Sequence, residues 1–158
     1  MDISFKFDNK KFNYRVCAVI LSGEKILVMQ DSRSPFYYLP GGRVKMGETV
    51  EEAIKRELFE ELGVAPRIIR PLWLNQAFFN EDVDRIDYHE LCLYFLIDIS
   101  DTDIMSRGEK FTQKEEAKTN TFEWIEIDSL KEKYFYPLFL KTEIFNLPTE
   151  FTLRTEYQ

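Results

Sequence analysis

The sequence predicts a mixed α/β or α+β sandwich in which helices pack on both faces of a mixed β-sheet. Two observations favour this fold class. Strand-like apolar segments occur both before and after one strongly patterned helical segment at residues 49–62. A second helical segment is expected in the tail that begins at Tyr136. Strands on either side of one helix, with another helix at the end, favour a sheet covered on both faces.

Size and composition point to one folded unit. The chain has 158 residues, of which 44% are hydrophobic and 31% charged, with six Gly and six Pro. This composition excludes a collagen-like, low-complexity or disordered chain. We therefore expect residues 1–158 to form a single domain with a substantial core.

The segment before the helix predicts a β-hairpin. Residues 14–21 are apolar and rich in strand-forming types, and residues 26–30 resume the same pattern after a short turn at residues 22–25. A loop at residues 31–37 and a turn at residues 40–42 then lead toward the helix.

The helix itself carries clear boundary signals. Its apolar positions are spaced three and four residues apart, and Gly63 follows the last of them. A glycine there adopts the left-handed conformation that ends a helix. We expect the helix to span residues 49–62.

The second half of the chain predicts further strands and short helices. Residues 101–118 are polar and are interpreted as a loop. Asp128 is expected to cap a short helix at residues 129–133. The expected strands lie at residues 67–79, at 90–99 after an acidic turn at 80–87, and at 121–127.

Charge and cysteine content limit the partners and the compartment. The net charge of −7 and the lack of a basic run argue against binding to duplex nucleic acid. The longest apolar runs, residues 16–21 and 91–97, are far shorter than the roughly 20 residues of a membrane span. Cys17 and Cys92 lie in apolar runs and are interpreted as buried thiols. With no signal-peptide pattern at the start, a cytoplasmic location is expected.

Three carboxylates share one side of the predicted helix. At about 100° per residue, Glu61 lies about 40° and Glu60 about 60° from Glu57, and the apolar Val50 lies at about 20°. Glu57 and Glu61 therefore lie within or beside the stripe that should face the core. Burying two like charges without a partner is costly. A bound divalent cation removes both problems, and oxygen ligands suit Mg²⁺ or Mn²⁺.

A purely structural alternative exists for any acidic helix, because Glu is a good helix former and charge runs usually face solvent. We accept that interpretation for Glu51 and Glu52. We reject it for Glu57 and Glu61 because of their placement and because of the motif that they complete.

Residues 42–64 match the pattern G-x5-E-x7-R-E-U-x-E-E-x-G-U, in which U is aliphatic, and they make up 23 of the 158 residues. This stretch resembles the Nudix box, and the chain is similar here to the Nudix hydrolases. The expected strand order on either side also fits that family's α/β fold, an α/β/α sandwich. Residues 38–42 also resemble the family's entry into the box. The nine matching positions are Gly42, Glu48, Arg56, Glu57, Leu58, Glu60, Glu61, Gly63 and Val64.

The resemblance implies an activity and a set of metal ligands. Members of the family hydrolyse a nucleoside diphosphate linked to another moiety, using Mg²⁺ or Mn²⁺. Glu57, Glu60 and Glu61 match the metal-binding glutamates of the box, and the carbonyl of Gly41 matches a backbone ligand. Metals bridging a pyrophosphate neutralise its charge and activate a bound water, so an acidic chain can process an acidic substrate.

Two further residues of the box have supporting roles by the same resemblance. Arg56 matches the arginine that pairs with the box glutamates and orients them. Glu48 is similar to the early glutamate that supports this network or binds a further metal.

One acidic group is expected outside the box. In many relatives the general base, or another metal ligand, lies on the loop before a Trp-containing strand, here the strand with Trp124. The preceding loop offers Glu115 and Glu116, of which we favour Glu116. The alternative is that this charged loop is simply solvated.

Substrate contacts are less constrained by the sequence. Arg33 and Arg43 are candidates for binding phosphates, although each could be an ordinary surface arginine. Phe78, Phe79 and Tyr88 are candidates for stacking on a base, although 15% of the chain is aromatic and core packing is the commoner role for any one of them.

The substrate stays open among several nucleotides. Subgroup signals downstream of the box are absent: ADP-ribose pyrophosphatases often carry a proline where Phe79 stands. An (oxidised) NTP or dNTP or a nucleotide sugar is therefore expected. The alternatives are a nucleotide-sensing module without turnover and a helical interaction domain with an incidental acidic helix. The resemblance favours a homodimer.

Overall fold

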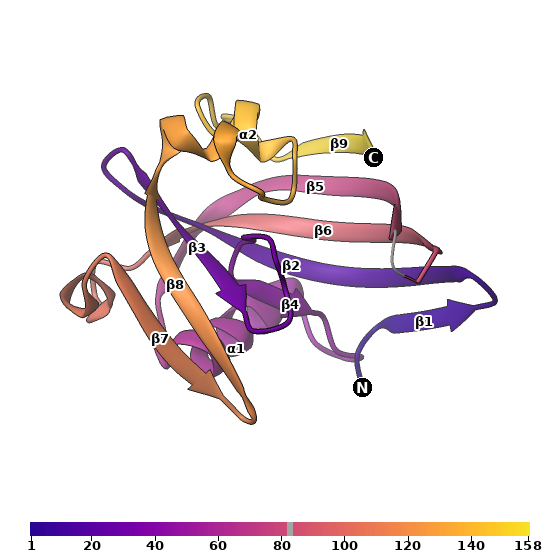
Figure 1. The fold of residues 1–158 in the computed structure, drawn as a ribbon, viewed down its shortest axis with the longest axis horizontal. Helices are drawn as coiled ribbons and strands as arrows, with labels where there is room; N and C mark the ends of the chain where they lie inside the picture. Colours follow the sequence, from indigo (N-terminus) through magenta and orange to yellow (C-terminus); the bar gives the residue numbers. More distant parts are fainter. Residues whose placement is uncertain (82–83) are drawn as a thin grey trace.

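The computed structural model describes residues 1–81 and 84–158. Its sheet has the strand order β7-β8-β3-β2-β6-β5-β9, with β1 and β4 also paired to β2 (Figure 1). The strands are β1 (Ser4–Phe7), β2 (Lys10–Ser22), β3 (Lys25–Asp31), β4 (Gly41–Arg43), β5 (Arg67–Glu81), β6 (Ile86–Asp98), β7 (Lys110–Glu115), β8 (Lys118–Glu126) and β9 (Thr152–Tyr157).

Helices cover both faces of this sheet, as the sequence predicts (Figure 1). Helix α1 (Val50–Leu62) packs through Ile54 and Leu58 on the face that carries Val16 and Ala18 of β2. The opposite face carries Cys17 and Val19 and is covered by the 3₁₀ helix η2 (Ile127–Glu132) and the short helix α2 (Leu140–Glu143). Alternate residues of β2 therefore serve two separate cores.

The sheet is mixed because β2 runs parallel to β6 and β5 runs parallel to β9, whereas the other pairs are antiparallel. The predicted hairpin exists but is short. Strands β2 and β3 pair only through Leu21 with Ile26 and Ser22 with Lys25. Beyond these residues β3 pairs with β8, and β2 pairs with β4 and β6. Strands β2 and β3 therefore separate beyond the turn, and β4 lies against β2 near α1.

The predicted loop at residues 101–118 is wrong in part. It contains a 3₁₀ turn (Ile104–Arg107) and strand β7, whose side chains alternate between half-buried and exposed. Phe111 of β7 stacks on Phe122 of β8 with ring centroids 5.3 Å apart. The polar composition hid this edge strand because only one of its faces packs.

The ends of the chain also differ from expectation. Strand β1 was not predicted, and the tail after Tyr136 holds a helix of only four residues followed by strand β9. Asp128 lies inside η2 and does not cap it. The predicted acidic turn at residues 80–87 is shortened by extension of β5 and β6, and residues 82–83 of it lie outside the described residues.

The two cysteines are free and buried, as predicted, and their sulfur atoms lie 3.5 Å apart. Within the part of the chain that the structure describes, no helix has the length and apolar character needed to cross a membrane.

Candidate functional site

Helix α1 begins and ends at residues that fix its position. The side chain of Thr49 accepts a hydrogen bond from the backbone of Glu52, and the Glu52 carboxylate accepts one from the backbone of Thr49. This capping box satisfies two backbone donors at the start of the helix. Gly63 ends the helix in the left-handed conformation, at φ 68°. The predicted helix is therefore confirmed, with Thr49 as its cap.

Two adjacent glycines allow β4 to lie close to both β2 and the helix. A side chain at Gly42 would collide with the carboxylate of Glu57, and one at Gly41 would collide with the backbone of Val16. The backbone N–H of Gly41 donates to Glu61 Oε1 at 2.8 Å. The Gly41 group that meets the carboxylates in this structure is therefore its N–H, and the role of its carbonyl as a metal ligand stays a prediction.

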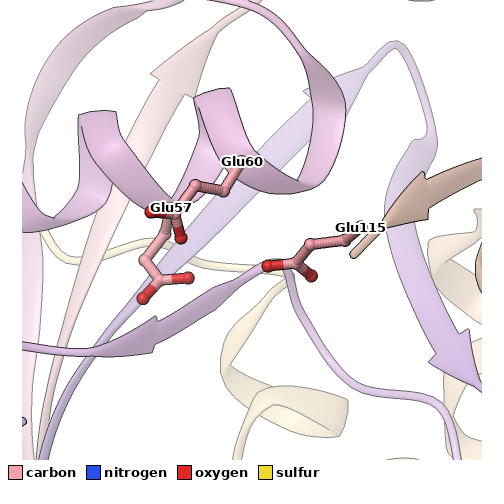
Figure 2. Close-up of side chains that lie close together, drawn as sticks. All are labelled: Glu57, Glu60 and Glu115. Atoms are coloured by element: carbon pink, nitrogen blue, oxygen red, sulfur yellow. The ribbon is translucent and has the colours of Figure 1, made fainter. Parts of the chain in front are cut away.

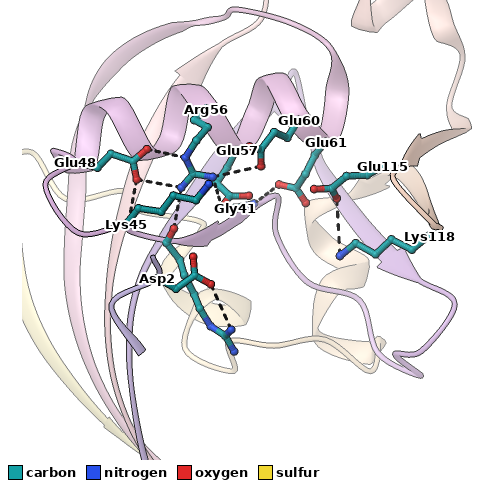
Figure 3. Close-up of polar contacts among 11 residues, drawn as sticks. Asp2, Gly41, Lys45, Glu48, Arg56, Glu57, Glu60, Glu61, Glu115 and Lys118 are labelled. Carbon is teal, nitrogen blue, oxygen red and sulfur yellow. Dashed lines mark hydrogen bonds and ion pairs between the residues drawn. The ribbon is translucent and has the colours of Figure 1, made fainter. Parts of the chain in front are cut away.

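Arg56 ties three carboxylates together (Figure 3). Its Nε and Nη2 donate to the two oxygens of Glu48 at 2.6 and 3.0 Å. Its Nη1 donates to Glu57 at 2.8 Å and to Glu60 at 3.3 Å. A further bond from Nη2 to the carbonyl of Arg43 spans 2.9 Å and joins the helix to β4. Such a fork of charge-assisted bonds holds the carboxylates in fixed orientations.

Three carboxylates from two elements converge at the edge of α1 (Figure 2). Glu57 and Glu60 come from the helix, and Glu115 comes from the end of β7. One oxygen from each lies within 4.8 Å of the others. We call Glu57, Glu60 and Glu115 the carboxylate cluster. Glu61 lies beside it and is only 4% exposed.

Burial and like charge oppose ionisation at this edge. Burial raises the pKa of Glu57 above its usual range; the Arg56 guanidinium opposes this rise, and Glu60 and Glu115 add to it. Burial, with the charge of Glu57, raises the pKa of Glu61 further, against the hydrogen bond from Gly41. These are the conditions that a bound cation would relieve.

The donor set fits a hard divalent cation. All three groups of the carboxylate cluster offer oxygen atoms. Arg56 donates to Glu57 and Glu60, and Asn120 donates to Glu115, and each carboxylate keeps further acceptor sites. Carboxylate oxygens are the ligands that Mg²⁺ and Mn²⁺ prefer. Glu48 is different, because Arg56 and the backbone of Lys45 occupy both of its oxygens. The Arg56 hydrogen bond, with further help from that backbone, lowers the pKa of Glu48, so it remains an anionic anchor for Arg56.

Outside the box, the structure brings Glu115 to the cluster and leaves Glu116 away from it. Strands β7 and β8 pair Glu115 with Lys118, so Glu116 lies in the tight turn between them. Glu116 has a φ of 53° and its side chain is exposed. The register of the β7–β8 hairpin decides which of the two glutamates faces the cluster, and the sequence does not display that register.

The two predicted phosphate-binding arginines have different settings. Arg33 is exposed, and its backbone N–H donates to Asp31 at 2.7 Å. Arg43 lies on β4 beside the site, and its side chain is 3.6 Å from Asp2. Sequence reasoning did not single out Arg15, which lies directly opposite Arg43. Only the pairing of β2 with β4 reveals that neighbour.

Phe78 and Phe79 lie on β5 in two separate ring groups. Phe79 stacks on Tyr88 with centroids 4.8 Å apart. Phe78 belongs to a set of rings that crosses five strands, with neighbouring centroids 4.5 to 5.7 Å apart. We call this set the aromatic row; its members are Phe5, Phe12, His89, Phe78 and Tyr157.

The aromatic row does not meet the carboxylate cluster. Phe12 is five residues from Cys17, which pairs with Gly41, and this separation is roughly 16 Å along a strand. The row lines an open hollow of about 680 Å³ at that end of the sheet, with Phe7, Lys10 and Asp87 also at its walls. The aromatic row and the carboxylate cluster are therefore separate features of the described structure.

The mixed sheet between helical layers makes this an α/β/α sandwich protein, and one helix of it carries a carboxylate cluster that could hold a metal ion. The comparisons identify the family: the NUDIX domain model matches residues 11–141. The chain belongs to the Nudix family.

Several curated proteins are similar to parts of this chain. An ADP-ribose pyrophosphatase from Methanocaldococcus jannaschii is 45% identical over 56 residues, covering 34% of this chain and 33% of that protein. The uncharacterized Nudix hydrolase YvcI from Bacillus subtilis is 26% identical over 114 residues, covering 72% of this chain and 65% of that protein. The chain thus spans less than two thirds of either relative.

Solved structures support the fold. A MutT protein from Bacillus halodurans superposes with a TM-score of 0.59 at 18% identity, covering 85% of this chain and 82% of the other. A MutT NUDIX hydrolase from Burkholderia pseudomallei gives a TM-score of 0.57 at 21% identity, covering 84% and 96%. The predicted fold class is confirmed.

Proposed function

We propose that this protein is a divalent-metal-dependent pyrophosphohydrolase that cleaves a nucleoside diphosphate linked to another moiety. The observation that carries the proposal is the convergence of Glu57, Glu60 and Glu115 within 4.8 Å, beside the buried Glu61. Family membership and relatives named for pyrophosphatase or diphosphatase activity support it. The complete set of box glutamates favours turnover over nucleotide sensing alone.

Each residue of the site then has a distinct task. Glu57, Glu60 and Glu115 would hold Mg²⁺ or Mn²⁺, with Glu61 adding charge behind them. Bound there, the cation would neutralise the pyrophosphate and lower the pKa of an attacking water. Arg56 keeps the glutamates oriented through its bonds to Glu48 and Glu57.

The backbone N–H of Gly41 and the side chain of Glu115 on β7 also contribute to the proposed site. The N–H of Gly41 donates to Glu61 at 2.8 Å and so helps to hold the buried carboxylate beside the cluster. Glu115 is the group of the cluster that does not belong to α1. Its Oε1 accepts a hydrogen bond from Asn120 at 3.1 Å and lies 3.8 Å from Lys118, so in this proposal Glu115 completes the cation site through its other oxygen.

The substrate class follows from the relatives and not from the site alone. Named relatives include an ADP-ribose pyrophosphatase and an 8-oxo-dGTP diphosphatase, the latter 57% identical over 28 residues. We propose a nucleoside diphosphate derivative or an oxidised nucleoside triphosphate as the substrate.

A panel of such compounds tests the proposal. ADP-ribose, nucleotide sugars, nucleoside triphosphates and their 8-oxo forms are incubated with the protein and Mg²⁺ or Mn²⁺. Released phosphate is measured with and without added phosphatase. We expect at least one compound to be cleaved and excess EDTA to stop the cleavage. The matched control is Glu51→Gln, an exposed glutamate on the same helix, which should retain activity. Cleavage that persists in excess EDTA would refute metal dependence.

A further inference from the structure

Arg15 and Arg43 form a pair of like charges across two strands. Residue pairing of β2 with β4 places them directly opposite each other. Both lie on the sheet face away from α1, because their neighbours Val16 and Val44 belong to the core beneath that helix. Like charges directly opposite in an antiparallel pair are destabilising, so this arrangement needs a compensating charge.

The acidic neighbours compensate only in part. Asp2 lies 3.6 Å from Arg43 Nη1, but the Nε of Arg43 is buried and lacks a hydrogen-bond partner in the described structure. Glu90 is the main attractive charge near Arg15. In residues 1–81 and 84–158, no side chain makes a hydrogen bond or ion pair with the half-buried guanidinium of Arg15. A buried, unsatisfied N–H is unfavourable unless a ligand accepts from it.

The pair lies next to the proposed active site. Two residues further along β2 is the pair Cys17 with Gly41, and the N–H of Gly41 donates to Glu61. Two residues along a strand are about 7 Å. Arg15 is also close enough to act on Glu61 electrostatically. An anion that reaches from the carboxylate edge past Gly41 would therefore meet both guanidinium groups.

We propose that Arg15 and Arg43 together bind a phosphate group of the substrate that the metal does not hold. This inference rests on the proposed function. It adds Arg15 as a specificity-determining residue and predicts which face of the sheet the substrate lies on. A phosphate between the two guanidiniums relieves their repulsion and accepts from the orphan Nε of Arg43. Guanidinium groups bind phosphate through paired charge-assisted bonds. The substrate then extends over the sheet face opposite α1.

The test uses inorganic pyrophosphate as the probe. Its dissociation constant is measured by calorimetry at fixed, saturating Mg²⁺ for the wild type, Arg15→Gln and Arg43→Gln. Loss of a charge-assisted contact worth about 1.5–3 kcal/mol weakens binding by about 10- to 100-fold. The matched control is Arg67→Gln, an exposed arginine paired with Asp98, which should bind pyrophosphate like the wild type.

A second readout separates a ligand clamp from an ordinary ion pair. If the arginines exist to bind phosphate, the ligand-free Arg15→Gln protein should be as stable as the wild type or more stable, because repulsion is relieved. Structural pairing of Arg15 with Glu90 would give a clear loss of stability and unchanged pyrophosphate binding, and would overturn the inference.

Failure of the inference and failure of the proposed function look different. The shift in melting temperature caused by Mg²⁺ alone should be at least as large in Arg15→Gln as in wild type, since neither arginine belongs to the carboxylate cluster and the charge of Arg15 acts on Glu61 against a bound cation. If substrates are cleaved with the same KM by Arg15→Gln as by wild type, the inference is wrong and the function stands. If no compound is cleaved but pyrophosphate binding still depends on both arginines, then Arg15 and Arg43 do bind phosphate and the proposed reaction is wrong.

Discussion

Three of the four acidic side chains at the helix edge come from a single five-residue stretch of α1, whereas the aromatic row takes one ring from each of five strands. The first region concentrates like charges beside a core, with Glu61 buried and the pKa values of Glu57 and Glu61 raised. The second stacks rings whose contacts stabilise the sheet. Function and stability therefore oppose each other at the carboxylate cluster, where repulsion between buried like charges lowers stability, whereas the aromatic row contributes stability.

The largest effect is expected at Glu61. Glu61→Gln keeps the volume of the side chain but removes a charge beside the cluster. Loss of about 3–4 kcal/mol of transition-state stabilisation would lower kcat roughly 10²- to 10³-fold. The metal-free melting temperature should stay the same or rise, because repulsion with Glu57 is relieved. Turnover within threefold of wild type would remove Glu61 from the metal site.

The same variant should change how stability depends on pH. Burial raises the pKa of Glu61 above its ordinary value of 4.5, so the folded state holds its proton to a higher pH than the unfolded state. This contribution to stability is therefore present at low pH and is lost as pH rises from about 4.5 through the raised pKa. Urea unfolding of metal-free protein between pH 5 and 7 should show wild type losing stability and Glu61→Gln losing less. Equal slopes would contradict the assignment.

Arg56 should give the next largest effect. Arg56→Gln removes the bonds to Glu48 and Glu57 and frees the cluster to reorient. Losing such an outer contact of a metal site typically costs about 10- to 100-fold in affinity or activity. Steady-state kcat/KM and Mn²⁺ affinity measure the loss, with the exposed neighbour Lys55→Gln as the control. Wild-type values for both quantities in Arg56→Gln would exclude it from the network.

Glu115 and Glu116 are a matched pair of adjacent residues. Glu115→Gln takes one oxygen ligand from the cluster and should lower kcat about tenfold, an ordinary cost for weakening one of several metal contacts. Glu116→Gln changes an exposed turn residue and should leave kcat within about twofold. The reverse ranking in steady-state assays would restore Glu116, the residue that the sequence favoured.

The smallest effect on turnover is expected in the aromatic row. Phe78 lies 4.5 Å from the ring of His89 and 5.2 Å from that of Tyr157. Phe78→Ala should lower the free energy of unfolding by about 1–3 kcal/mol and leave kcat/KM within about twofold. Phe79→Ala, whose ring lies on the other face of β5, should by contrast raise KM if the substrate extends past Arg15. A tenfold fall in kcat for Phe78→Ala would show that the aromatic row takes part in turnover.

The parts of the molecule that could be predicted from sequence are those encoded locally. Helix α1 carries its own period, its cap at Thr49 and its stop at Gly63, so its span and the common side of its glutamates follow from adjacent residues. The role of Arg56 is also local, since it bonds Glu48 and Glu57 from the same segment.

Features that depend on strand register could not be predicted. Strand β7 is polar on its exposed face and reads as a loop, and the choice between Glu115 and Glu116 depends on how β7 turns into β8. The pairing of Arg15 with Arg43 exists only once β4 lies against β2. The expected homodimer and cytoplasmic location stay predictions.

Direct titration of Mn²⁺ into metal-free protein tests whether the edge of α1 is a metal site. We expect saturable binding, a rise in melting temperature with Mn²⁺ concentration because the unfolded chain has no formed site, and much weaker binding in Glu57→Gln than in Glu51→Gln. A melting temperature unchanged by millimolar Mn²⁺, or Mn²⁺ binding by Glu57→Gln as tight as in wild type, would contradict a metal site at this edge.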